Sequence, residues 1–454
     1  MTSLNHYPAF ILCALLASTQ SVSAQSTEDP ISRPAVEAAN AAVPARQESS
    51  LDKLIEQALV SYPAILSNES LIQAAKYDVN AARLKFFPNL ALSNSFSSLA
   101  LADQAGSNQG ASNLTITQPL YQGGALEAGQ NKASAKMRVS YQALREVKQD
   151  VARRVITNYG EWLKAYTKIL AQQENVQLHE KLVELISSRV KEEVASRADM
   201  NLAISRLLTA QADLTTQLSY EKSALNALSQ LVGQPIQRAD LVNVKTAAKA
   251  LPPREQILEI ARLNSPTIQR MTLEAQVARE ESKEIRAQLS PQIALQAQVQ
   301  IGSAVLPNAP NYNTVGLTLN YATGNGFSTV AYAKSAGDRA NASELQIQTA
   351  HRDLNDRLSS EINEYEFSKI KIESLQKSAD LAEEISESYD RQFLVGRKSW
   401  LDLMNTVRER AQNKFTLADV EVSFITTSWK ISVALGQENI APDFTEIPLM
   451  SMFR

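Results

Sequence analysis

The chain has 454 residues, a formal net charge of −3 at pH 7 and an isoelectric point near 5.9, so its charge does not indicate nucleic-acid binding. It holds only 14 Gly, and its abundant Ala, Leu, Gln, Glu and Lys favour helix. The three His residues, His6, His179 and His351, are far apart. No metal site or His-based catalytic group can be assembled from them, so we expect neither an enzyme nor a cofactor.

The N-terminal segment indicates an exported protein. A short apolar stretch at 9–16 precedes the small-residue sequence Val22-Ser23-Ala24, which predicts a signal peptide over 1–24. Residues 25–50 hold few large apolar side chains and are expected to be a flexible leader. Cys13 is the only Cys, and the apolar stretch continues beyond it, so we expect no lipid anchor. After the signal, no segment approaches the roughly 18 apolar residues of a spanning helix.

The first half of the mature chain, 51–250, is expected to open with a helix and a hairpin. Residues 51–87 have a helical pattern interrupted at Pro63, because the residue before a proline does not easily stay helical. The hairpin covers 88–121, where two segments that alternate apolar and polar residues enclose a Gly-, Asn- and Ser-rich loop at 103–112.

Long helices are expected over 125–231. This stretch contains no Pro, and its apolar residues keep the spacing of a coiled-coil seam. Polar residues interrupt the seam at 195–201, where we expect a helix-to-helix turn. The first of these helices would hold about 70 residues and reach roughly 100 Å, about three times the hydrocarbon thickness of a bilayer.

The second half, 251–437, repeats the first. A helix leads to a hairpin at 291–322, and long helices follow over 328–434 with an interruption at Val395-Gly396-Arg397. Residues 438–454 are expected to be an irregular tail. Residues that correspond in the two halves include Pro63 and Pro266, Arg83 and Arg286, Pro88 and Pro291, and Tyr121 and Tyr321. A unit of about 200 residues is too long for a solenoid repeat and indicates one duplicated structure.

The opening strand of the second hairpin has two chemically different faces, because successive side chains alternate across a strand. The apolar face carries Ile293, Leu295, Ala297, Val299 and Ile301, and the other face carries Gln292, Gln296, Gln298 and Gln300. A soluble sheet with one face in a core shows this pattern. A transmembrane barrel with lipid outside and a wet lumen shows it too.

Four strands cannot close a barrel by themselves. Isolated hairpins are barely stable in water, and open sheet edges are not tolerated in lipid. Eight strands from a dimer would leave little pore, whereas twelve strands from a trimer would enclose a lumen lined by Gln and Ser. The chemistry of the strands therefore favours a homotrimer.

Several features recur together along the mature chain. They are the two-fold repeat, a hairpin in each half, the strand-to-helix turn at Tyr121-Gln122-Gly123-Gly124, and a helix turn over 395–403 that contains Gly396, Arg397 and Trp400. Together they resemble the TolC family of outer-membrane channels over nearly all of the mature sequence. The resemblance implies a mixed, mostly α fold: a duplicated long-helix coiled-coil tunnel with two β-hairpins per chain that complete a trimeric 12-stranded transmembrane β-barrel.

The same resemblance implies a location and partners. The barrel would lie in the outer-membrane lipid of a Gram-negative bacterium, and the tunnel would cross the periplasm and close at its inner end. A periplasmic adaptor protein and an inner-membrane transporter would dock onto it.

The stretch from Phe393 to Trp400, followed by Asn405 to Glu409, resembles the LapE/AggA-like channels of type I adhesin secretion. The expected function is therefore the exit duct of a type I secretion system that exports a large adhesin. One alternative is the outer-membrane channel of a drug or metal efflux pump. Another, of a different class, is a soluble exported coiled-coil scaffold, which would not explain two matching hairpins.

The resemblance also assigns residues to a gate at the inner end of the tunnel. Asp402 falls at the family's gate Asp, where three carboxylates would form a ring that attracts cations; the alternative is an ordinary solvated Asp on a helix. A second Asp ring of the family falls at Asn405, which is uncharged. Lys398 and Phe393 fall at an Arg and a Tyr that tether the closed helices, and Phe393 lacks the hydroxyl.

The tether partners in the first half fall at Met200 and Asn201, next to Asp199. Asp199 and Lys398 are therefore a candidate closing pair. The alternative is that they are two unrelated surface charges.

Overall fold

The computed structural model describes residues 51–101, 104–241, 248–302 and 311–436, which belong to one compact unit of the chain, Glu48–Arg454. The expected signal peptide, leader and C-terminal tail lie outside the described residues. In the part of the chain that the structure describes, no helix combines the length and the apolar character needed to cross a bilayer.

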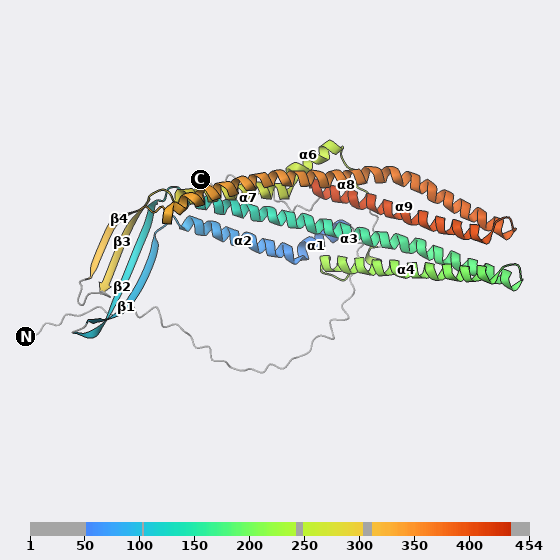
Figure 1. The fold of residues 1–454 in the computed structure, drawn as a ribbon, viewed down its shortest axis with the longest axis horizontal. Coiled ribbons are helices and arrows are strands. Elements are labelled where there is room, and N and C mark those ends of the chain that lie inside the picture. Colours follow the sequence, from blue (N-terminus) through green and yellow to red (C-terminus); the bar gives the residue numbers. More distant parts are fainter. Residues whose placement is uncertain (1–50, 102–103, 242–247, 303–310, 437–454) are drawn as a thin grey trace, which may run out of the picture. The chain divides into compact units, whose positions relative to one another are not determined.

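The two halves of the chain contain the same elements in the same order (Figure 1). The first half contains α1 (Leu51–Ser61), α2 (Pro63–Leu84), β1 (Asn89–Leu101), β2 (Gln104–Tyr121), α3 (Ala125–Lys191) and α4 (Arg197–Val232). The second half contains α6 (Arg254–Asn264), α7 (Pro266–Ala287), β3 (Gln292–Gly302), β4 (Tyr312–Asn320), α8 (Ser328–Leu394) and α9 (Trp400–Leu435). Two short elements, α5 (Arg238–Leu241) and η2 (Asn325–Phe327), lie between these. Corresponding helices have equal lengths, 67 residues for α3 and α8 and 36 for α4 and α9.

Local chemistry explains where α2 and α7 begin. Each starts at a proline, Pro63 or Pro266, whose fixed φ suits the first helical position and whose missing N–H is not needed there. Ser265 precedes Pro266, and its hydroxyl accepts a hydrogen bond from the backbone N–H of Ile268 at 3.3 Å. The break between α1 and α2 confirms the predicted interruption at Pro63.

The strands form one antiparallel sheet in the order β1-β2-β3-β4, so the two hairpins lie side by side through β2 and β3 (Figure 1). The loop expected at 103–112 is wrong, because residues 104–112 belong to β2 and pair with β1. Phe96 pairs directly with Gly110, and its ring lies 3.0 Å from where a Cβ of that glycine would stand. Cross-strand backbone pairing here overrides the low strand propensity of Gly, Asn and Ser.

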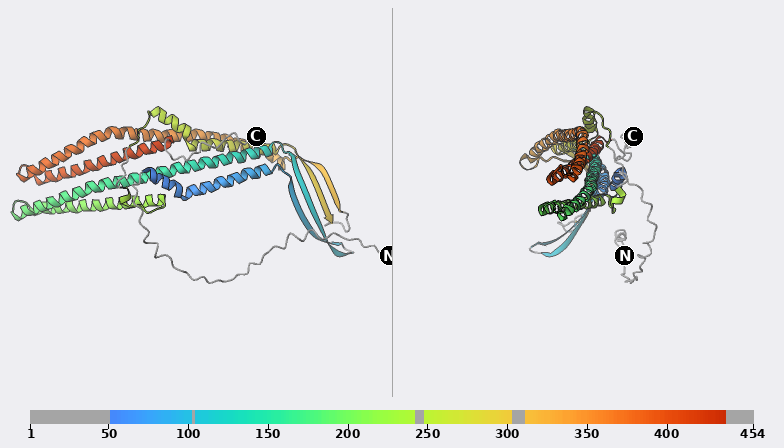
Figure 2. Two further views of the ribbon diagram at one scale, coloured as in Figure 1. Left: turned by 180° about the vertical axis from the view of Figure 1, so that it is seen from behind. Right: turned by 90° about the vertical axis from the view of Figure 1, so that its right-hand side faces the viewer.

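Helix α3 is central among the helices. It contacts α2 and α4, and it also contacts α7 and α9, which in turn contact α8 (Figures 1 and 2). α4 runs back along α3, and α9 runs back along α8 (Figure 1). The first half of the chain is therefore joined to the second half through α3.

Apolar clusters lie between these helices. The largest surrounds Tyr159 and Trp162 of α3, which are 0% and 1% exposed with ring centroids 5.5 Å apart. A second cluster joins α6, α8 and α9 around Leu358 and Ile431. A third cluster joins α3, α4, α8 and α9 near the helix turns and includes Leu403.

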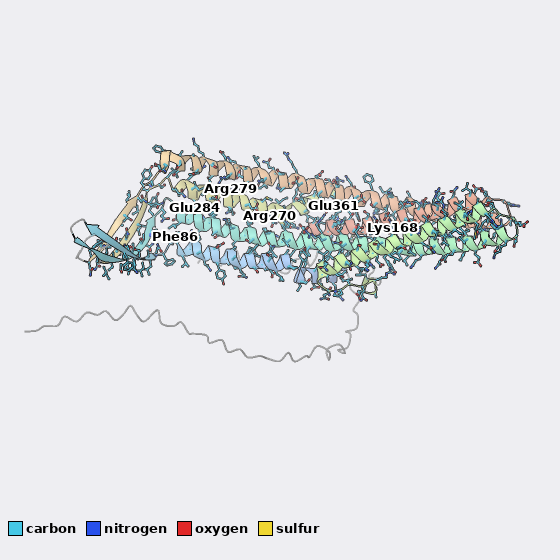
Figure 3. All side chains as sticks on the ribbon, turned by 60° about the horizontal axis from the view of Figure 1, so that its bottom comes forward. Phe86, Lys168, Arg270, Arg279, Glu284 and Glu361 are labelled. Carbon is cyan, nitrogen blue, oxygen red and sulfur yellow. The ribbon has the colours of Figure 1, made fainter. Side chains whose placement is uncertain are left out.

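Ion pairs add polar contacts between α3 and the second half. They join α3 to α7, to α8 and to α9, and they follow one another along its length (Figure 3). In chain order along α3 they are Lys132–Glu284, Glu146–Arg270, Arg153–Glu361 and Lys168–Asp419. Opposite charges attract most strongly where they lie close together, so these pairs favour the observed alignment of α3 against α7, α8 and α9.

Candidate functional site

The candidate site lies where the long helices reverse. α3 and α8 each leave the sheet and continue for 67 residues, about 100 Å at about 1.5 Å per residue. The chain then turns at 192–196 and at 395–399 into α4 and α9. Both turns lie at the end of the helices remote from the sheet (Figure 1).

Each turn ends in the same capping box. The Ser196 hydroxyl accepts a hydrogen bond from the backbone N–H of Asp199 at 3.1 Å, and the Asp199 carboxylate accepts one from the backbone N–H of Ser196 at 3.2 Å. Ser399 and Asp402 repeat the arrangement before α9 at 3.1 and 3.3 Å. The boxes satisfy N–H groups that have no partner inside the helix.

The first turn lies earlier than expected. The sequence placed it at 195–201, but α3 ends at Lys191 and α4 begins at Arg197. The reason is the capping box at Ser196, which starts the helix before the predicted turn is complete. Met200 and Asn201 therefore lie in the first turns of α4, where Met200 packs against the third apolar cluster and Asn201 is exposed.

Asp402 and Asn405 are exposed and lie three residues apart in the first turns of α9, while Leu403 and Met404 between them are buried. The hydroxyl and backbone N–H of Ser399, together with the charge of Lys398, hold the pKa of the Asp402 carboxyl below its ordinary value. Asp402 is thus an exposed carboxylate at neutral pH, and Asn405 presents a neutral amide on the following turn.

Lys398 and Phe393 are both engaged within the second hairpin of helices. The ammonium of Lys398 donates a hydrogen bond to the Tyr389 hydroxyl at 3.2 Å and lies 4.3 Å from the centre of that ring. Phe393 is 5% exposed and packs against Trp400 with ring centroids 5.5 Å apart. Within one chain, Lys398 and Asp199 thus contact different partners, and a closing pair between them stays a prediction.

The second turn confirms the interruption expected around Gly396. This residue adopts φ 75°, and its N–H donates to the Phe393 carbonyl at 3.0 Å. The N–H of Arg397 donates to the Gln392 carbonyl at 2.9 Å. A left-handed residue that closes the last helical carbonyls is the usual end of a helix, and glycine adopts it without steric cost.

Arg189, in the last turn of α3, is a residue that the sequence did not single out. One guanidinium nitrogen donates hydrogen bonds to the carbonyls of Phe393 at 3.2 Å and Leu394 at 3.1 Å. Its Cζ lies 4.3 Å from the centre of the Phe393 ring. A basic residue near the end of a long helix was the only signal in the sequence, and it does not reveal a partner 204 residues away.

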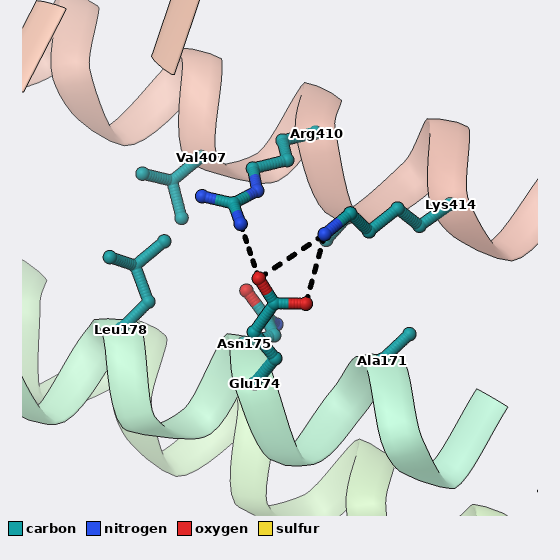
Figure 4. A pocket seen from close by; sticks show the side chains of 8 residues that line it. Ala171, Glu174, Asn175, Leu178, Val407, Arg410 and Lys414 are labelled. Atoms are coloured by element: carbon teal, nitrogen blue, oxygen red, sulfur yellow. Dashed lines mark hydrogen bonds and ion pairs between the residues drawn. The ribbon is translucent and has the colours of Figure 1, made fainter. Parts of the chain in front are cut away.

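A group of four charged side chains ties α3 to α8 and α9 further from the turns. Glu174 of α3 pairs with Arg410 and with Lys414 of α9, at 2.9 Å for Lys414 (Figure 4). Both cations also pair with Glu383 of α8. Burial raises the pKa of Glu174, but the hydrogen bonds and charges of Lys414 and Arg410 outweigh it and hold that pKa below its ordinary value.

The glutamines of β3 lie on a polar face that continues across the sheet. Gln296 pairs with Thr117 of β2 and Gly316 of β4, and Gln298 pairs with Thr115 and Thr314. Directly paired residues point to the same side of a sheet. The other two glutamines also have polar partners: Gln300 pairs with Asn113 and Tyr312, and Gln292 pairs with Asn320.

The opposite face of the same sheet is apolar and open. Leu92 pairs with Leu114, and Leu295 pairs with Leu317. Their exposed fractions include 67% for Leu92 and 70% for Leu317. An exposed apolar sheet face of this extent needs an apolar environment or a partner.

Within the described residues, no group of His, Cys, Asp and Glu is arranged to hold a metal ion.

Comparison with known proteins gives a family and relatives. The family described as "Outer membrane efflux protein" matches residues 54–234 and 257–437, one match in each half. The alkaline protease secretion protein AprF of Pseudomonas aeruginosa is 23% identical over 330 residues, which cover 69% of this chain and 67% of that protein. The outer membrane protein TolC of Escherichia coli is 21% identical over 413 residues, which cover 87% and 83%.

Solved structures share the fold. The outer-membrane channel OprN superposes with a TM-score of 0.73 at 16% identity and covers 86% of this chain and 90% of its own. The outer membrane protein VceC of Vibrio cholerae also gives 0.73 at 16% identity, over 85% and 96%. CusC gives the same score at 17% identity, over 85% and 92%.

Proposed function

The chain belongs to the outer membrane efflux protein family, as an outer-membrane channel protein that extends into the periplasm, and from this premise we propose that it is the exit duct of a type I secretion system. The proposed cargo is a large adhesin. The observation that carries the channel function is the two-faced sheet, polar along the glutamines of β3 and apolar and exposed on the other side.

The unpaired edges of this sheet support a homotrimer. Within the described residues, β1 and β4 each have one partner strand, and open edges are not tolerated in lipid. Three copies of the four-stranded sheet would supply twelve strands, with lipid against the apolar face and water against the glutamines.

The outer helices support the same assembly. α8 carries large apolar side chains that the chain leaves exposed at helical spacing: Leu345 (61%), Phe367 (68%), Ile370 (67%), Leu381 (57%) and Ile385 (46%). α4, which packs along α3, carries Ile204 (38%), Leu208 (58%) and Leu218 (40%). These surfaces would meet between neighbouring copies.

The secretion branch is supported by the turn sequence from Phe393 to Trp400 and by the relative named as a protease secretion protein. Efflux of drugs or metals is the second candidate, favoured by the family description. In either case a periplasmic adaptor and an inner-membrane transporter would dock at the turns, and selection of the cargo would lie with the transporter.

Asp402 is proposed as the gate residue. Three exposed carboxylates at the ends of α9 would attract cations and narrow the inner mouth of the tunnel. Asn405 would follow as a neutral ring, and Asp199 with Lys398 would close neighbouring helices. Asp402 is exposed in the single chain, and the proposed ring of three carboxylates would form only when three copies assemble.

The test is a planar-bilayer recording of the purified protein beside Asp402→Ala, after heat-modifiable trimers have been shown on a denaturing gel. Small, cation-selective openings that become larger or less selective in the variant are the expected result. An identical pore would remove Asp402 from the gate. Folded protein without any pore would favour a coiled-coil scaffold, and loss of secretion in a deletion strain with unchanged drug sensitivity would favour the secretion branch.

A further inference from the structure

One guanidinium group joins the two turns of the chain. Arg189 belongs to the last turn of α3, and it contacts the last turn of α8 through the Phe393 and Leu394 carbonyls and the Phe393 ring. The final carbonyls of a helix lack partners within the helix and carry its negative partial charge. A cation that binds two of them at once is therefore well suited to hold that end of α8.

The contact is supported by what lies beneath it. Phe393 is buried and packs against Trp400, the first residue of α9. Trp400 and Leu403 belong to the third apolar cluster, together with Leu182 of α3. Arg189 thus covers the outer edge of the apolar contact between the two helical hairpins, and its loss would expose that edge to water.

The contact is not repeated by the internal symmetry. Ser196 and Ser399 occupy equivalent places before α4 and α9, so the residue equivalent to Arg189 is Gln392. The Gln392 amide donates to the Ser388 hydroxyl of its own helix at 3.0 Å. Arg189 of the α3–α4 pair therefore holds the α8–α9 pair. The equivalent position of the α8–α9 pair, Gln392, makes no such contact in return.

We infer that Arg189 is a positioning residue that holds the turn of α8 and α9 against α3 and so favours the narrow state of the inner mouth. This inference rests on the proposed channel function. It differs from the gate assigned to Asp402, because Arg189 contacts the backbone of its own chain and does not line a ring of carboxylates. A lost hydrogen bond to a charged group changes a two-state ratio by roughly an order of magnitude.

The experiment compares Arg189→Ala with Arg391→Ala as its matched control. Like Arg189 in α3, Arg391 lies in the last turn of a long helix, α8. Its side chain is 69% exposed, and its pair with Glu387 spans 3.9 Å on the surface. A single introduced thiol, Leu403→Cys, reports access to the apolar cluster, since Leu403 is 1% exposed. Heat-modifiable trimers of each variant are treated with a maleimide and then recorded in a planar bilayer, with the protein lacking the introduced thiol as background.

Arg189→Ala is expected to raise both the labelling rate and the ratio of large to small openings by about tenfold, with trimers intact and the Arg391→Ala trimer unchanged. Arg189→Lys is expected to keep part of the wild-type behaviour, with smaller rises in labelling and in large openings than Arg189→Ala. One ammonium can bind a carbonyl but cannot cover the ring as a planar guanidinium does. If Arg189→Ala forms no trimer, the lysine variant decides the question.

Equal labelling or equal openings in the Arg189 and Arg391 variants would overturn the inference. A pore in the wild-type protein would still support the proposed channel function. Labelling that rises with unchanged openings would also overturn it, because the contact would then be structural only. Failure of the wild-type protein to form a pore would count against the proposed function. Equal maleimide labelling of the Arg189→Ala and Arg391→Ala proteins would then also show that Arg189 does not cover the apolar cluster.

Discussion

Asp199 and Asp402 occupy the same place in the two halves of the chain. Each is the third residue of a helix, and each exchanges hydrogen bonds with a serine that precedes the helix. The carboxylate assigned to the gate is therefore also the helix cap of its turn, and its counterpart caps the other turn. Substitutions at these positions will combine effects on the pore with effects on the turns.

The two effects can be separated at the serines. Ser399→Ala removes the hydroxyl that accepts from the Asp402 N–H at 3.1 Å but leaves the carboxylate in place. We expect a loss of about 1 kcal/mol of helix stability, the usual cost of a missing N-cap. Thermal conversion of the trimer on a denaturing gel measures it, with Ser196→Ala as the equivalent change in the first half. A Ser399→Ala pore that lost cation selectivity as fully as Asp402→Ala would contradict this separation.

Gly160 allows α3 and α9 to approach closely. A Cβ at this position would stand 2.3 Å from Cγ2 of Thr426. We expect Gly160→Ala to destabilise the protein by about 1–3 kcal/mol through overpacking. Thr426→Ser removes the obstructing methyl group and keeps the hydroxyl, so the double variant should recover much of the loss in a thermal denaturation scan.

Gly129 is the matched control for this change, since it lies in the same helix. The nearest atom to a Cβ there is Glu284 Oε1 at 3.5 Å. Gly129→Ala should therefore be neutral or stabilising by up to about 1 kcal/mol. Equal effects at the two glycines would mean that helix propensity, and not contact with Thr426, decides the outcome.

Acid should weaken the contact between α3 and α9 at Glu174. Its pKa is lowered in the folded protein, so its contribution is present above the ordinary pKa, about 4.3, and is lost as pH falls through the folded value. We expect Glu174→Gln to lower the thermal midpoint near pH 7 and to have less effect in acid. The energy should stay below about 1 kcal/mol, because the carboxylate is 47% exposed and solvent screens it.

The control for that pH dependence is Glu373→Gln. Glu373 pairs with Lys377 on the same helix, and both side chains are more than 70% exposed, at 77% and 71%. The Glu373→Gln substitution should therefore shift the thermal midpoint little at any pH. A pH profile of Glu174→Gln parallel to wild type would show that the Arg410 and Lys414 contacts do not stabilise the folded state.

The two turns differ in backbone strain. Gly396 has φ 75° with no atom within 4 Å of a Cβ, whereas Glu193 has φ 60° in the first turn. Gly396→Ala should cost about 1 kcal/mol, purely from the left-handed backbone. Glu193→Gly removes the same strain and should be less harmful than Gly396→Ala in a thermal denaturation scan. A loss as large as that of Gly396→Ala would show that the Glu193 side chain matters more than its backbone angle.

The sequence by itself determined the duplication, the hairpin in each half and the alternation of Gln292–Ile301. It also determined the break before Pro63 and the interruption at Gly396. These features depend on periodicity and on residues whose backbone preferences act locally, so they can be recognised without knowing which segments meet.

Only the tertiary structure decided which distant segments meet. It paired β2 with β3, extended β2 over the segment expected to be a loop, and brought Arg189 to the Phe393 carbonyl. Backbone hydrogen bonds from a neighbouring strand override weak local propensity. Which helix end a charged side chain reaches depends on the packing of helices separated by some two hundred residues, and no local pattern records that packing.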